Sequence, residues 1–116
     1  MPKYAVLLYR DEANPVPPGT PEHQQLYQTW GKFNEEIGKS GVLTTGIGLS
    51  PSSSATTVRV RDGKTLTTDG PFAETKEQLG GVFLFDCKDL DEAIQWAAKV
   101  PDAAITGVEI RPVWGG

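Results

Sequence analysis

Cysteine, histidine and methionine each occur only once among the 116 residues of the chain. A single cysteine excludes an internal disulfide, and one histidine with one cysteine cannot supply the usual nitrogen and sulfur ligands of zinc. The carboxylates also lack the spacing of a calcium loop, so we expect no metal and no cofactor. A chain of this length can fold on one hydrophobic core, and we expect a single domain over residues 1–116.

The sequence also lacks a basic excess and any long apolar run. Eleven Lys and Arg residues stand against fifteen Asp and Glu residues, which gives a net charge of −4. Nucleic acid is therefore not an expected partner, because its phosphates are bound by clustered positive charge. No signal peptide and no spanning segment is recognisable, so we expect no membrane association and a cytoplasmic location.

Apolar periodicity and turn residues predict an α+β protein. Strands are expected at 3–10, 42–49, 82–87 and 107–113, with helices from about 21 to 40 and from about 90 to 100. Thr20 and Asp89 are the expected N-caps, and Gly41 is the expected stop of the first helix. The order β-α-β-β-α-β is the split βαβ pattern of a ferredoxin-like fold with both helices on one face of the sheet.

Residues 56–68 are predicted to form an inserted β-hairpin, because the Asp-Gly pair at 62–63 suits a type I′ turn between two alternating runs. A two-residue turn pairs Arg61 with Lys64 and places Arg59 on the same face. Arg59 and Arg61 are candidates for binding an anionic ligand, with a solvated basic face as the plainer interpretation.

The second helix is expected to bury Leu90, Ala93, Ile94 and Ala97. Trp96 falls on the opposite side of that helix, either partly exposed or in contact with another subunit. Cys87 ends a buried strand and is interpreted as a core thiol rather than a nucleophile.

The charged stretch 68–81 is the part of the chain that packing does not explain. Its Gly-Pro bend is rigid, and it is followed by a group of charges around one aromatic residue. These side chains form either a structural turn or one wall of a ligand cleft. As a cleft wall, Asp69 would be a base or hydrogen-bond acceptor, with Glu74 or Lys76 orienting the ligand. Phe72 would close the cleft or, as we favour, anchor the loop in the core.

The residues Asp69-Gly70-Pro71-Phe72, followed by Glu74, Lys76-Glu77 and Gly80, resemble the signature of the DGPF-domain branch of the YCII-related proteins. The segments 4–9, 89–93 and 108–113 fit the same family in order. The resemblance implies a ferredoxin-like fold that dimerises into an α+β barrel with a cleft.

A proposed His-Asp pair of the wider family is missing from this sequence. The two places fall near Trp30 and near 50–51, where neither partner stands, so the acid-base mechanism of those relatives is not carried over. His23, the only histidine, lies in the first turn of the helix, near the Pro-rich loop 11–19 that we expect to pass over the end of the first strand. Trp30 and His23 are retained as ligand-binding candidates.

The strands at 3–10 and 82–87 are apolar on both faces, although two helices can cover only one face. We therefore expect a homodimer packed sheet to sheet, with a cleft at each end that binds a small organic molecule. Likeness to other dimeric α+β barrels suggests a cofactor-independent isomerase, lyase or monooxygenase. The alternative is a non-catalytic interaction or regulatory protein, because members of this family are often encoded beside extracytoplasmic-function sigma factors.

Overall fold

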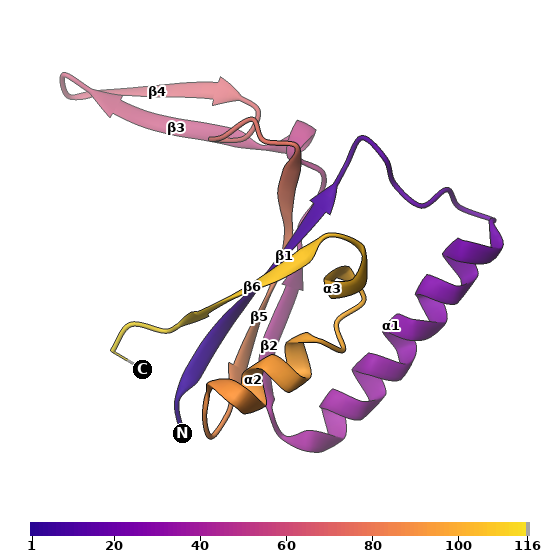
Figure 1. Ribbon diagram of the computed structural model, residues 1–116. Helices are drawn as coiled ribbons and strands as arrows, with labels where there is room; N and C mark the ends of the chain where they lie inside the picture. The colour runs from indigo at the N-terminus through magenta and orange to yellow at the C-terminus, as the bar shows by residue number, and fades with distance from the viewer. Residues whose placement is uncertain (116) are drawn as a thin grey trace.

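A computed structural model describes residues 1–115 and shows a mixed α+β architecture (Figure 1). The final residue of the expected domain, 116, lies outside the described residues. In chain order the elements are β1 Lys3–Asp11, α1 Pro21–Ser40, β2 Leu43–Gly48, the 3₁₀ turn η1 Ser52–Ser54, β3 Thr56–Arg61, β4 Lys64–Asp69, β5 Glu77–Asp86, α2 Leu90–Ala97, α3 Asp102–Ile105 and β6 Gly107–Pro112.

Four strands form the main sheet in the order β2-β5-β1-β6, and every neighbouring pair is antiparallel. The strands β3 and β4 form a separate two-stranded ribbon. With the ribbon set aside, this is the strand order of a ferredoxin-like βαββαβ sheet. The predicted fold class is confirmed.

The hydrophobic core lies between one face of the sheet and the helices. Strand side chains and helix side chains meet there in one cluster, which includes Tyr4, Val6, Leu8, Phe85, Phe33, Ile37, Ala93 and Ala97. The alternate residues of β1 and β5, among them Leu7, Val82 and Leu84, point to the opposite face and are only partly buried. The prediction of two apolar faces with helices on only one of them is confirmed.

Helix α1 begins and ends where its capping residues predicted. The Thr20 side chain accepts a hydrogen bond from the backbone N–H of His23 at 3.2 Å, and Gly41 adopts a left-handed conformation with φ of 78°. Phe33 and Ile37, in the second half of the helix, are buried, whereas Leu26 and Trp30 nearer its start are only half-buried. The first half of α1 therefore does not close onto the sheet.

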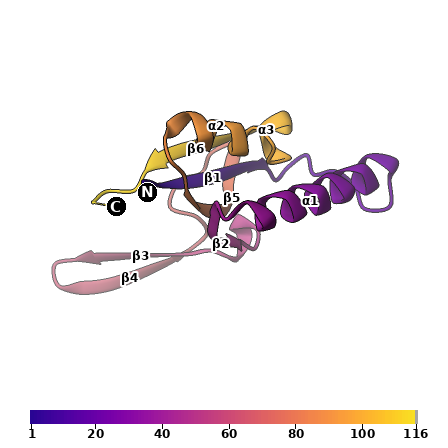
Figure 2. The same cartoon turned by 90° about the horizontal axis from the view of Figure 1, so that it is seen from below.

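The hairpin has the predicted turn and register. Residues 62 and 63 have φ values of 53° and 73°, as a type I′ turn requires, and Arg61 pairs with Lys64. The ribbon projects away from the sheet and helices in both views (Figures 1 and 2), and Val58 and Val60 are largely exposed. The Cα radius of gyration is 16.3 Å, compared with about 13 Å for a compact chain of about 100 residues. The single chain is thus unusually open.

Two expectations about the second half of the chain were wrong. Strand β5 begins at Glu77 rather than Val82, because Asp11 and Glu77 still pair at the far end of the β1 ladder. The end of the charged stretch is therefore strand and not loop.

Helix α2 buries only part of the predicted face. Leu90 and Ile94 are each 48% exposed, whereas Ala93 and Ala97 are buried because small side chains let the helix approach the sheet closely. Trp96 packs against the core, and the Lys99 ammonium lies 4.7 Å from the centroid of its ring.

Cys87 is fully buried, in agreement with its interpretation as a core thiol. Burial, together with the nearby Glu92 carboxylate, raises the pKa of the Cys87 thiol to about 11. Within residues 1–115, no helix has both the length and the apolarity needed to cross a bilayer.

Candidate functional site

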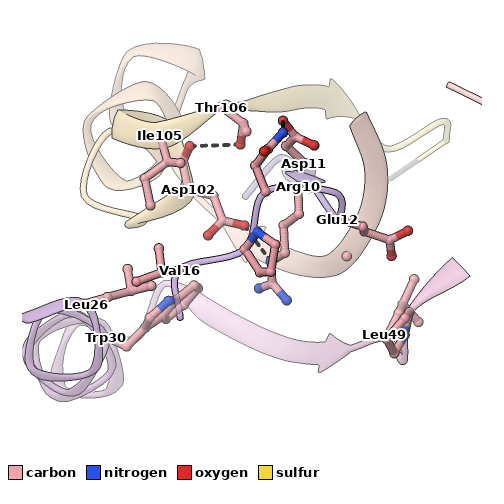
Figure 3. Close-up of a pocket in the computed structure, with 14 residues that line it drawn as sticks. Arg10, Asp11, Glu12, Val16, Leu26, Trp30, Leu49, Asp102, Ile105 and Thr106 are labelled. Atoms are coloured by element: carbon pink, nitrogen blue, oxygen red, sulfur yellow. Dashed lines mark hydrogen bonds and ion pairs between the residues drawn. The ribbon is translucent and has the colours of Figure 1, made fainter. Parts of the chain in front are cut away.

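A cavity of about 430 Å³ lies at the end of the sheet where α1 diverges from it (Figure 3). It is enclosed by the end of β1 with the loop that follows, α1, the segment after β2, the bulged part of β5, and α3. Its lining is mainly apolar and includes Val16, Leu26, Trp30, Leu49 and Ile105. The volume and the lining are those of a pocket for a small organic molecule.

One ion pair lies inside this largely apolar cavity. The Arg10 Nε–H donates to Asp102 Oδ2 at 3.0 Å, and the Asp102 side chain is 7% exposed while the Arg10 side chain is 45% exposed. Thr106 donates its hydroxyl hydrogen bond to the Tyr9 carbonyl, which also ties α3 to β1. Asp102 is therefore held in place, and it fixes the Arg10 side chain from one side.

Gly80 makes room for the Arg10 side chain. The pairing of β1 with β5 shifts between Leu8 and Tyr9, so that Gly80 is the extra residue of a β-bulge. A Cβ atom at Gly80 would lie 2.7 Å from Arg10 Cδ. The absence of a side chain at this position allows Arg10 to lie across β5 and to extend into the cavity.

Two carboxylates stabilise the loop that forms one wall. Glu12 accepts hydrogen bonds from the Ser52 backbone N–H at 2.8 Å and from its hydroxyl, while Asp11 accepts from the Asn14 side-chain amide at 2.9 Å. These bonds lower the pKa of both carboxyl groups. The loop after β1 lines the cavity, and its ionised carboxylates place negative charge at the rim of the cavity.

Trp30 connects the cavity to the aromatic part of the core. Its ring meets Phe33 edge to face, with centroids 5.9 Å apart, and lies 6.3 Å from the ring of Phe83. A second hollow of about 290 Å³ shares Arg10 and Trp30 with the first. Pro51 lines the main cavity as well, so the two places implied for the missing His-Asp pair come together in one site.

The predicted catalytic residues are not in this site. Asp69 and Glu74 are exposed and line neither the cavity nor the adjoining hollow. Lys76 lies elsewhere, in a shallow depression that also includes Tyr9 and Glu109. The structure does not gather the three residues around a common space, and their catalytic role stays a prediction.

Of the predicted ligand-binding residues, only Trp30 lines the cavity. His23 is half-buried in the first turn of α1 and lies outside the lining. Phe72 is 80% exposed, so it does not anchor its loop in the core of the chain, contrary to the interpretation we favoured. The Arg59 guanidinium carbon lies 5.4 Å from the Phe72 ring centroid, and Arg61 donates to the carbonyl of its neighbour Val60.

The bend of the charged stretch is bonded to the base of the hairpin. The Gly70 N–H donates to the Ala55 carbonyl at 2.8 Å, and the Thr57 hydroxyl donates to the Gly70 carbonyl at 2.8 Å. Gly70 has a φ of 108°, a conformation that suits glycine. This part of the stretch therefore joins the hairpin to the main sheet.

Sequence reasoning missed Arg10 and Asp102, which are separated by 92 positions. No local pattern links two residues so far apart, and the short helix α3 that begins at Asp102 was not predicted. One signal was present for Arg10, because it is a charged residue at the end of a strand that is apolar on both faces.

No cluster of three or more His, Cys, Asp or Glu side chains in the described part of the chain is arranged to hold a metal ion.

A family model described as the YCII-related domain matches residues 2–115. Over 112 residues the chain is 37% identical to an uncharacterised protein of Rhizobium meliloti (strain 1021), an alignment that covers 95% of this chain and 90% of the relative.

The role of Gly80 can be tested with a single methyl group. In Gly80→Ala the new Cβ displaces Arg10, and we expect a loss of about 1–3 kcal/mol in the free energy of unfolding, as for other overpacked sites. Gly48→Ala is the matched control, because a Cβ atom there meets nothing within 4 Å. Urea denaturation measures both, and equal stability of the two variants would contradict the packing of Arg10 on Gly80.

Proposed function

The chain belongs to the YCII-related domain family, and from this premise we propose that it forms a homodimer and binds a small organic molecule in the cavity beside α1 and α3. The observation that carries the binding proposal is the cavity of about 430 Å³, in which apolar side chains surround one ion pair. Natural ligand pockets combine a mainly apolar lining with a few polar groups in the same way.

The apolar side chains of the cavity are left in contact with water in the single chain. Leu49 is 43% exposed and Ile105 is 59% exposed, although both face the cavity. Removing such surface from water is favourable by about 25 cal/mol per Å². An apolar ligand that fills the cavity therefore gains free energy from a surface that is already formed.

The proposal is one of binding rather than proton transfer. Each carboxylate in the lining already accepts a hydrogen bond, Asp11 from Asn14, Glu12 from Ser52 and Asp102 from Arg10. Each of these carboxylates thus holds a neighbouring part of the cavity wall in place, and none has a histidine or other proton carrier among the described lining residues. We therefore favour a binding protein over an isomerase, lyase or monooxygenase.

Filling the cavity tests this proposal. The neutral fluorescent dye N-phenyl-1-naphthylamine is expected to bind the wild type. In Leu26→Trp the larger side chain occupies the space, and we expect dye binding to weaken about tenfold or more, because a loss of about 1.4 kcal/mol gives that factor. Leu90→Trp is the control, because Leu90 is an exposed residue of α2 outside the lining. Equal dye binding by the two variants, or none by the wild type, would contradict the assignment of the cavity.

The outer face of the sheet supports the homodimer. Leu7, Val82 and Leu84 lie side by side on it without a covering helix, and Ile47 extends the patch at the edge strand β2. Four strands about 4.8 Å apart and about six residues long present roughly 400 Å². A stable interface needs about 800 Å² from each partner.

The hairpin can supply the remaining area. Its residues Val58 and Val60 are exposed on one face of a ribbon that stands clear of its own sheet (Figure 2). A second copy of the chain offers an apolar sheet face for these side chains. We propose that the sheet patch and the hairpin together form the interface of a dimer in which the cavities, on the helix side, remain open.

A charge placed in the sheet face tests the dimer. The wild type is expected to elute with the mass of a dimer in size-exclusion chromatography with light scattering, and Leu84→Glu as a monomer, because a buried unpaired carboxylate is strongly unfavourable. Tyr27→Glu, on an exposed position of α1, serves as the control and stays dimeric. A monomeric wild type at micromolar concentration would contradict the proposal.

A further inference from the structure

We infer that the ligand is a monocarboxylate with an aromatic or similarly flat apolar body, whose carboxylate pairs with the free end of Arg10 while the body packs against Trp30. This inference rests on the proposed binding function and adds the chemical class of the ligand. It follows from three features of the cavity: an incompletely bonded guanidinium, the arrangement of charge around it, and the aromatic surface beside it.

The guanidinium of Arg10 has hydrogen-bond donors to spare. Only its Nε–H donates to a protein acceptor, Asp102, among the described residues, so the terminal N–H groups face the cavity unbonded. The buried Asp102 and the bulge at Gly80 fix the direction of the side chain. A guanidinium held in this way is prepared for a bidentate bond to a carboxylate, which matches its planar fork.

The surrounding charges favour one negative charge over two. Asp102 offsets much of the Arg10 charge, and the ionised Asp11 and Glu12 stand at the rim, so a phosphate dianion would be repelled. An ammonium group would meet Arg10 inside the cavity, and the rim carboxylates already accept bonds from Asn14 and Ser52. A carboxylate carries one negative charge, so it is repelled less than a phosphate dianion, and it can pair with Arg10, which an ammonium group cannot.

The surface for the ligand body lies on one side of Arg10. In Figure 3, Trp30, Leu26 and Val16 lie together on that side, whereas Glu12 and Leu49 lie on the other. Trp30 is the outermost ring of an aromatic group that continues into the core through Phe33. An aromatic ligand ring would extend this group with the edge-to-face or offset geometry that aromatic pairs prefer.

Three ligands of one shape test the charge preference. Isothermal titration at pH 7 compares 2-naphthoate, 2-naphthamide and 2-naphthylmethylamine, which share a ring system and differ in the charge of the polar group. A charge-assisted bidentate bond predicts that the wild type binds the acid about tenfold or more tightly than the amide. The amine is expected to bind least.

Variants separate the anchor from the ring surface. In the double variant Arg10→Gln/Asp102→Asn both charges are removed together, so neither is left buried without a partner, and the preference for acid over amide should disappear. Trp30→Ala is the matched variant, and it should weaken acid and amide by the same factor. The neutral dye N-phenyl-1-naphthylamine should still bind the double variant, which shows that its cavity is intact.

The outcomes distinguish this inference from the binding function on which it rests. If the wild type binds neither the dye nor any naphthyl compound, the proposed function fails. If it binds the dye but takes acid and amide equally, or prefers the amine, the inference is overturned and the binding function stands. Tighter binding of 2-naphthyl phosphate than of 2-naphthoate would likewise overturn the assignment to a carboxylate. The wild-type comparison decides the matter even if the double variant does not fold.

Discussion

The ion pair between Arg10 and Asp102 is the contact on which the cavity depends. It joins the end of a central strand to the first residue of α3, and it does so beside a glycine bulge that leaves space for the arginine stem. Because α1 diverges from the sheet at the same end, the pair is covered on one side and open on the other. A polar anchor thus stands within an apolar space, which is the arrangement that small-molecule recognition requires.

The two faces of the sheet serve different purposes in this account. One face carries the helices, the core and the cavity, while the other has the apolar Leu7, Val82 and Leu84 beside the Glu109–Arg111 ion pair of β6 and no covering element in the single chain. The proposed second copy covers that surface and leaves the cavity accessible from the helix side. Assembly and ligand binding can therefore be altered separately by substitutions on opposite faces.

The features that could be predicted from the sequence are those set by neighbouring residues. Thr20 and Gly41 mark the ends of α1, and the Asp-Gly pair at 62–63 fixes the hairpin register, because caps and tight turns are local. The exposed positions of Leu90 and Ile94 were not predictable in this way. They depend on how closely α2 approaches the sheet, which is a property of tertiary packing.

The candidate site was only partly predictable for the same reason. Trp30 was a candidate because it stands where the resemblance places the histidine of the wider family, but its partners in the cavity come from segments far along the chain, including Asp102. The charged stretch, in contrast, is hydrogen-bonded through Gly70 to Ala55 and Thr57 at the base of the hairpin. Unusual turn residues are easy to recognise in a sequence, whereas a site whose residues come from distant segments leaves little local signal.

A crystal structure of the protein with bound 2-naphthoate tests the central claim most directly. The account predicts both carboxylate oxygens about 2.7–2.9 Å from the terminal nitrogens of Arg10, with the naphthyl ring against Trp30 and Asp102 still bonded to Arg10 Nε. A carboxylate bound instead to Arg59 or Arg61 of the hairpin, with the cavity beside α1 empty, would contradict it.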